Sequence, residues 1–213
     1  MNTDKLIQIL ASDSMRDSHP AFKRRLLLAI GLGGGISFLM MATLLKIRPD
    51  LMFAATLPTF WLKVFFAIAL LGVGLMGATK TAMPGKPITN PYWKIALPIL
   101  VIWIIAYWTI ISPSAPETAE LIKGSTWQVC SLLIAFLSMP IFILVFWVLR
   151  DMASVRPRLT GFMAGLFSGG LAASIYSLHC PELSPVFVGI WYLLGILIPA
   201  TIGALLGKKI LRW

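Results

Sequence analysis

The sequence predicts an all-α integral membrane protein with six transmembrane helices, and three observations predict this class. First, 58% of the 213 residues are hydrophobic and 12% are charged, whereas a soluble domain carries roughly 25% charged residues. Second, the hydrophobic residues form six long runs. Third, most of the 18 Lys and Arg residues, which outnumber the 8 Asp and Glu residues, fall between these runs, as in the cytoplasmic loops of membrane proteins. So little charge cannot cover a globular surface in water, which excludes a soluble enzyme.

Each of the six runs is long enough to cross a bilayer. About 20 mostly apolar residues span a hydrocarbon core of roughly 30 Å, and a helix satisfies every backbone N–H and C=O group within the segment. The predicted spans are residues 26–45, 60–79, 92–111, 129–149, 161–178 and 185–206. The chain is thereby divided into an N-terminal segment, residues 1–25, and a six-helix transmembrane domain, residues 26–213.

The distribution of Lys and Arg predicts the orientation. With the N-terminus in the cytoplasm, 14 basic residues lie on the cytoplasmic side and 4 on the outer side. The outer four are Lys46, Arg48, Lys63 and Lys123. Because cytoplasmic loops carry the excess of Lys and Arg, both termini are predicted to be cytoplasmic. We therefore expect a multi-pass protein that contacts the lipid bilayer along its length.

The spans lack the residues that transport and catalysis require. Pumps and transporters keep ionisable residues at membrane depth, but no Asp, Glu, His, Lys or Arg lies near the middle of a predicted span. Lys63 and Lys94 lie near helix ends, where long side chains are expected to reach the headgroups. The sequence also lacks H-E-x-x-H, G-x-S-x-G, P-loop and C-x-x-C motifs. We therefore expect no enzymatic activity and no permanently bound cofactor.

Small residues recur at helical spacing in three spans. In the fifth span they follow every four residues, as Gly161, Gly165, Gly169, Ala173 and Ser177. The first and sixth spans repeat the spacing at Gly31 and Gly35 and at Gly203 and Gly207. Such ladders let helix backbones approach closely in lipid. We expect them to pack helices of one chain together; a dimer face or a moving interface is the alternative.

Two cysteines are the candidate sensing residues. Cys130 begins the fourth span and Cys180 lies just beyond the fifth, so both are predicted at the outer face. His179 and Glu182 flank Cys180, and if all four converge they offer a soft heavy-metal ion two thiolates, an imidazole and a carboxylate. An oxidant would instead join the thiols in a disulfide, provided that their Cα atoms lie within about 7 Å. The alternative is that both cysteines are small buried hydrophobic residues.

The N-terminal segment contains a candidate partner-binding helix. Thr3 is placed to cap a short cytoplasmic helix, in which Leu6, Ile9 and Leu10 share one face. A helix of about ten residues is marginal in water, so we expect it to fold against a partner with its apolar face in a groove. The alternative is a helix that lies flat on the membrane beside the basic run Lys23-Arg24-Arg25.

Short motifs follow one another along almost the entire chain. They are Thr3-Asp4 with Leu6-Ile7, Arg48-Pro49-Asp50, Phe60-Trp61-Leu62-Lys63, Gly124-Ser125-Thr126-Trp127-Gln128-Val129-Cys130, Leu178-His179-Cys180-Pro181-Glu182, Phe187-Val188 with Trp191-Tyr192-Leu193-Leu194-Gly195, and Leu211-Arg212-Trp213. Each is weak alone, but the ordered set resembles the NrsF-type negative regulators of extracytoplasmic-function (ECF) sigma factors. The chain departs from the commoner zinc-binding anti-sigma domain, whose His and Cys-x-x-C are absent.

The resemblance implies a function. It implies a six-span inner-membrane anti-sigma factor that sequesters an ECF sigma factor in unstressed cells, with no direct contact to nucleic acid. It implies that the sigma factor is bound by the cytoplasmic N-terminal segment, which corresponds to roughly residues 2–25 here. It also implies that the family's cysteine pair, which corresponds to Cys130 and Cys180, responds to heavy metals or oxidants, with a metal ion bound only transiently.

Two other classes of function stay open at this point. One is a small-solute transporter or channel, and the other is a membrane thiol oxidoreductase whose Cys130 and Cys180 exchange electrons with a quinone. The missing charges at membrane depth weigh against the first, and the missing C-x-x-C weighs against the second.

Overall fold

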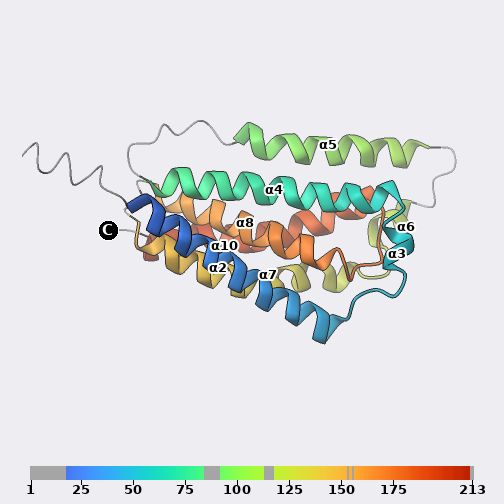
Figure 1. Ribbon diagram of the computed structural model, residues 1–213. Helices are drawn as coiled ribbons and strands as arrows, with labels where there is room; N and C mark the ends of the chain where they lie inside the picture. The colour runs from blue at the N-terminus through green and yellow to red at the C-terminus, as the bar shows by residue number, and fades with distance from the viewer. Residues whose placement is uncertain (1–17, 84–91, 113–117, 153, 155, 212–213) are drawn as a thin grey trace, which may run out of the picture.

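The computed structural model describes residues 18–83, 92–112, 118–152, 154 and 156–211 (Figure 1). Every regular element in these ranges is helical, which confirms the predicted all-α fold. The α-helices are α2 (Ser18–Met40), α3 (Leu51–Ala54), α4 (Pro58–Ala82), α5 (Tyr92–Ile111), α6 (Thr118–Lys123), α7 (Trp127–Arg150), α8 (Pro157–Tyr176), α9 (Pro185–Phe187) and α10 (Leu193–Ile210). Two π-helical turns extend α2 and precede α10, namely η1 (Met41–Leu45) and η2 (Val188–Tyr192).

Six helical stretches are long and apolar enough to cross a membrane, and each overlaps one predicted span. They are Ala21–Leu45, Pro58–Ala82, Trp93–Ile111, Ala119–Arg150, Pro157–Tyr176 and Pro185–Ile210. The number and position of the predicted membrane-length helices are therefore confirmed, whereas their crossing of a membrane and the side that each end faces stay predictions. The N-terminal helix predicted around Thr3, Leu6, Ile9 and Leu10 lies outside the described residues.

Helix α8 is the centre of the bundle. It packs against α10, α4 and α7, with α2 lying on the outer side of α7 (Figure 1), and it is the most buried of the six membrane-length stretches. The close approach depends on small residues, because a Cβ atom at Gly165 would overlap the carbonyl group of Pro199, and one at Gly161 that of Gly203. The predicted role of the ladder in packing helices of one chain is confirmed for α8 and α10.

The same prediction was wrong for the first span. Among the described residues, a Cβ atom at Gly31 or Gly35 would meet nothing within 4 Å, so this pair faces away from the other described helices. The glycine that permits close packing in α2 is Gly33, where a Cβ atom would lie 2.8 Å from the Cα atom of Ile141 on α7. Spacing alone does not say which face of a helix is turned inward.

Hydrogen bonds between hydroxyl groups join the C-terminal end of α4 to the start of α8. The Thr160 hydroxyl donates to Thr81 Oγ1 at 2.9 Å, and Ser154 Oγ lies 2.7 Å from Thr160 Oγ1. Ser154 Oγ also donates to the Thr81 carbonyl oxygen at 3.2 Å. Thr81 and Thr160 are buried, so these bonds hold α4, α8 and the connection that precedes α8 in one arrangement.

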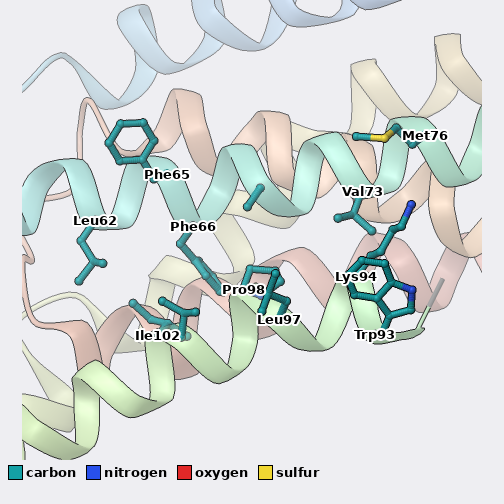
Figure 2. A pocket seen from close by; sticks show the side chains of 12 residues that line it. Leu62, Phe65, Phe66, Val73, Met76, Trp93, Lys94, Leu97, Pro98 and Ile102 are labelled. Carbon is teal, nitrogen blue, oxygen red and sulfur yellow. The ribbon is translucent and has the colours of Figure 1, made fainter.

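Helix α5 lies at the edge of the bundle and leaves a groove against α4 (Figure 2). The groove has a volume of about 500 Å³, and apolar side chains such as Phe65, Phe66 and Pro98 line it. Lys94 lies at one end of the groove, with its Nζ atom 5.4 Å from the centre of the Trp93 ring. An apolar, open surface of this kind suits contact with lipid.

Candidate functional site

The candidate site lies at the end of the bundle where α3 and α6 are found (Figure 1). The connection from α8 to α9, residues 177–184, passes through it and contains Cys180; we refer to this connection as the thiol loop. The loop leaves α8 through hydrogen bonds that continue the helical pattern, with the Cys180 N–H donating to the Tyr176 carbonyl at 3.0 Å. Its other end is capped by Ser184, whose Oγ atom accepts from the Phe187 N–H.

Cys130 and Cys180 come together in this site. Cys130 is held in the first turn of α7, where its N–H donates to the Thr126 carbonyl at 3.0 Å. Both cysteines are free thiols with no exposed surface, and their side chains interact directly. The two cysteines therefore lie at one end of the bundle, as the sequence predicted, and they are not joined by a disulfide in this structure.

The surroundings favour a thiolate at Cys180. The pKa of Cys180 is lowered from its ordinary 9.0 to about 6, first because Cys130 hydrogen-bonds to its sulfur and second because the Lys63 ammonium is near. Burial opposes both effects. The site thus contains one sulfur that accepts a hydrogen bond and a second that donates it.

Two tyrosines enclose the thiols. The rings of Tyr176 and Tyr192 lie 5.9 Å apart, centre to centre, and both residues are fully buried. Among the described residues, neither hydroxyl has a partner that meets hydrogen-bond geometry, but both phenols are near enough to interact with the sulfurs. The thiols are therefore screened from water by aromatic side chains.

Lys63 does not extend to the headgroups, so that prediction was wrong. Its side chain is fully buried, and its ammonium donates to the carbonyl oxygens of Cys180 at 2.8 Å and Glu182 at 3.1 Å. The ammonium also lies 5.3 Å from the centre of the Phe60 ring. The carbonyl groups of the thiol loop, together with this ring, replace the water that an ammonium group normally requires.

Arg48 holds the same carbonyl from another direction. Its Nη1 atom donates to the Cys180 carbonyl oxygen at 3.2 Å, and its Nε and Nη2 atoms donate to the Asp50 carboxylate at 2.7 and 2.6 Å. This two-bond pairing raises the pKa of Arg48 and lowers that of Asp50. In addition, the Arg48 N–H donates to the Leu178 carbonyl, so the α2–α3 connection and the thiol loop form one hydrogen-bonded unit.

The side chains of His179 and Glu182 are not brought to the thiols. Nδ1 of His179 lies 2.8 Å from the Lys46 carbonyl oxygen, to which it donates, and Oε1 of Glu182 accepts from the N–H and the hydroxyl of Ser125, both at 2.7 Å. Gly124 makes room for this carboxylate because it has no Cβ atom, and its φ of 50° is in the left-handed region that favours glycine. In the part of the chain that the structure describes, no group of three or more His, Cys, Asp or Glu side chains is placed to hold a metal ion.

The site therefore has a different composition from the expected one. The two thiols are present, but their neighbours are Lys63, Tyr176 and Tyr192 instead of His179 and Glu182. Tyr176 appeared in the sequence as an ordinary residue of an apolar span, and no local signal separates it from packing residues, whereas Tyr192 belongs to the motif Trp191-Tyr192-Leu193-Leu194-Gly195. A signal existed for Lys63 and for Arg48, because each belongs to a short motif shared with the resembled family. The candidate partner-binding residues Thr3, Leu6, Ile9 and Leu10 lie outside the described residues.

Comparison with known proteins gives concordant results. The family described as "Negative regulator of sigma F" (NrsF) matches residues 10–213. The chain is 44% identical over 213 residues to the "Probable anti-sigma-F factor NrsF" of Azospira oryzae, with 100% of both chains covered. It is 40% identical over 216 residues to the "Anti-sigma-F factor NrsF" of Caulobacter vibrioides, again with 100% of both chains covered. No solved structure matches the chain.

Proposed function

The chain belongs to the family of negative regulators of sigma F, NrsF, and from this membership we propose that it is an anti-sigma factor that sequesters an ECF sigma factor at the bacterial inner membrane. The observation that carries the proposal is the identity of 44% and 40% to two proteins named as anti-sigma-F factors, over their full lengths. Six membrane-length helices support the membrane location. A regulator of this kind is not an enzyme and needs no direct contact with nucleic acid.

The sigma factor is bound by the N-terminal segment, residues 1–25. The apolar face formed by Leu6, Ile9 and Leu10 is the proposed contact, with Thr3 capping the helix. The sigma factor supplies the groove that this short helix needs in order to fold. Binding there withholds the sigma factor from RNA polymerase.

Release begins at Cys130 and Cys180. An oxidant takes two electrons from the pair, the sulfurs lose whatever protons they carry, and one S–S bond forms between them. The adjacency of the free thiols supports this step. A thiophilic metal ion is the second proposed signal: it would bind the two sulfurs as thiolates, displace their protons and leave again when the stress ends. His179 and Glu182 are no longer needed as ligands in either case.

The signal must be strong enough to change the occupancy of the sigma factor. A shift from 99% bound to 1% bound requires about 5.5 kcal/mol of difference between the two states. A disulfide or a metal–thiolate site is of the right order, since structural zinc sites contribute about 10–16 kcal/mol.

A pull-down from membranes tests the proposal. Full-length protein should recover an ECF sigma factor, and the same protein lacking residues 2–16 should not, because the candidate contact is removed while Lys23-Arg24-Arg25 is kept. Recovery by both proteins would move the contact to the cytoplasmic loops. If neither recovers a sigma factor at normal expression, the anti-sigma proposal is wrong for this chain and a solute-flux assay in liposomes becomes the next experiment.

The sensing step has its own test. Replacing Cys130 and Cys180 together with Ser should leave the sigma factor bound and abolish its release by oxidant or metal. A reporter of sigma-dependent transcription measures this directly. Normal induction in the double variant would exclude the two thiols as the sensor.

A further inference from the structure

The thiol loop is attached to helix α4 through one side chain. Lys63 lies in the second turn of α4 (Pro58–Ala82), and its ammonium donates to two carbonyl groups of the loop, those of Cys180 and Glu182. Among the described residues, Lys63 has no carboxylate within ion-pair distance. Its buried charge therefore depends on the loop carbonyls, and the loop carbonyls depend on it.

Helix α4 continues from this attachment to the opposite end of the bundle. Thr81 lies about five turns further along the helix, roughly 27 Å at 1.5 Å per residue, which is close to the thickness of a hydrocarbon core. There it is bonded to Thr160 and Ser154. One rigid element thus joins the thiol loop to the connection between α7 and α8.

A change at the thiols must act on this attachment. Disulfide formation imposes a specific separation and dihedral angle on two residues, whereas the described thiols are free and accommodated among Tyr176, Tyr192 and Lys63. Because Lys63 Nζ and Arg48 Nη1 both hold the Cys180 carbonyl, a movement of that carbonyl either breaks these bonds or moves α4. Two states of the loop therefore differ either in their contacts with Lys63 or in the position of α4, which is the condition for coupling.

We propose that Lys63 is the positioning residue that transmits the state of the Cys130–Cys180 pair to helix α4 and, through α4, to the opposite end of the bundle. Arg48 supports the loop but belongs to the α2–α3 connection, so it does not provide this link. The inference rests on the proposed function only in identifying oxidation of the thiols as the natural signal. The coupling itself is a property of the bundle.

Hydrogen exchange followed by mass spectrometry tests the coupling in the full-length protein in lipid nanodiscs. The reduced protein is compared with protein oxidised by diamide, an azo compound that accepts the two electrons and two protons. In the unaltered protein we expect altered exchange in residues 177–184 and a severalfold change in residues 78–82 of α4. In Lys63→Met the disulfide should still form, the loop should still respond, and the change in residues 78–82 should be lost.

Two variants serve as controls. Lys94→Met removes a lysine from α5 that the thiol loop does not contact, and Arg48→Met removes the second donor to the Cys180 carbonyl without cutting the link to α4. Both should keep the response of residues 78–82. The inference is wrong if the hydrogen exchange of residues 78–82 does not change on oxidation of the unaltered protein, a result that needs no variant. It is also wrong if the exchange of these residues changes as strongly in Lys63→Met as in the unaltered protein. A normal response of α4 without release of a sigma factor would instead overturn the proposed release step and leave the coupling intact.

Discussion

The two sulfurs of the candidate site have different chemical roles, although both belong to cysteine. Cys180 carries the lowered pKa because Cys130 donates to it and Lys63 lies nearby. A thiolate attacks an oxidant or binds a soft metal ion, whereas a thiol does so poorly. Aromatic rings from Tyr176 and Tyr192 exclude water from this pair. The arrangement favours a first reaction at Cys180, followed by closure with Cys130.

The pH dependence of oxidation follows from the lowered pKa of Cys180. Because this pKa of about 6 lies below the ordinary 9.0, the thiolate is present at neutral pH and is lost as the pH falls through about 6. The rate of disulfide formation by diamide should change little from pH 9 to about pH 7 and then fall about tenfold per pH unit below about pH 6. Quenching with acid and separating the products on a non-reducing gel measures the rate.

The variant Cys130→Ala, which has no donor group in its side chain, provides the control for this prediction. It removes the thiol that donates to Cys180, so the pKa of the remaining cysteine should rise toward its ordinary value. Alkylation of Cys180 by a small maleimide should then require a higher pH than in Lys94→Met, which keeps the thiol pair. A rate in the unaltered protein that climbs steeply between pH 8 and pH 9 would show an ordinary thiol and contradict the assignment.

At the scale of the helix, whether a glycine is needed for packing depends on which atoms of the neighbouring helix face it. In α8, Gly165 lies against the backbone of Pro199 and Ala200 on α10, and a Cβ atom there would lie 2.6 Å from the Ala200 Cα atom. Backbone cannot move aside as a side chain does, so Gly165→Ala forces the two helices apart. We expect a loss of about 1–3 kcal/mol of stability, the usual range for overpacking, seen as a lower melting temperature in detergent.

Gly35→Ala is the matched control for this change. It introduces the same methyl group in α2, where nothing lies within 4 Å of it. Alanine also favours a helix over glycine by about 1 kcal/mol in water, so the melting temperature should stay the same or rise. Equal losses in both variants would mean that the α8–α10 contact does not depend on Gly165.

The helices could be predicted from neighbouring residues in the sequence to a greater extent than the contacts of the candidate site. The six spans could be predicted because length and hydropathy alone decide whether a segment can cross a bilayer. That Cys130 and Cys180 lie at the same end of the bundle could be predicted by counting the spans between them. The partners of Lys63 could not be predicted, because its acceptors lie on Cys180 and Glu182, more than a hundred residues away. His179 and Glu182 are neighbours of Cys180 in sequence, but in an irregular loop adjacent side chains point to different partners.

At the scale of the whole molecule, the two ends of the bundle have different chemistry. One end contains the thiols, Lys63 and the Arg48–Asp50 pair, and the other contains the Thr81, Thr160 and Ser154 hydroxyls. Sensing and partner binding are proposed at opposite ends, so the bundle must carry the signal across the membrane. Placing the thiols at the end away from the partner is useful for sensing oxidants if they face the periplasm. Oxidation of thiols is favoured in the periplasm and opposed in the cytoplasm.

The orientation of the bundle can therefore be tested by labelling single cysteines in a background in which Cys130 and Cys180 are replaced by Ser. Glu120→Cys on α6 and Lys208→Cys on α10 place exposed thiols at opposite ends. In spheroplasts, a membrane-impermeant maleimide should label Glu120→Cys and should label Lys208→Cys only after lysis, because the excess of Lys and Arg keeps the end with Lys208 in the cytoplasm. Detergent-solubilised protein, in which both variants should be labelled, controls for reactivity. The opposite pattern would expose the thiol loop to cytoplasmic glutathione, which keeps thiols reduced, and the proposed sensing of periplasmic oxidants by Cys130 and Cys180 would then be wrong.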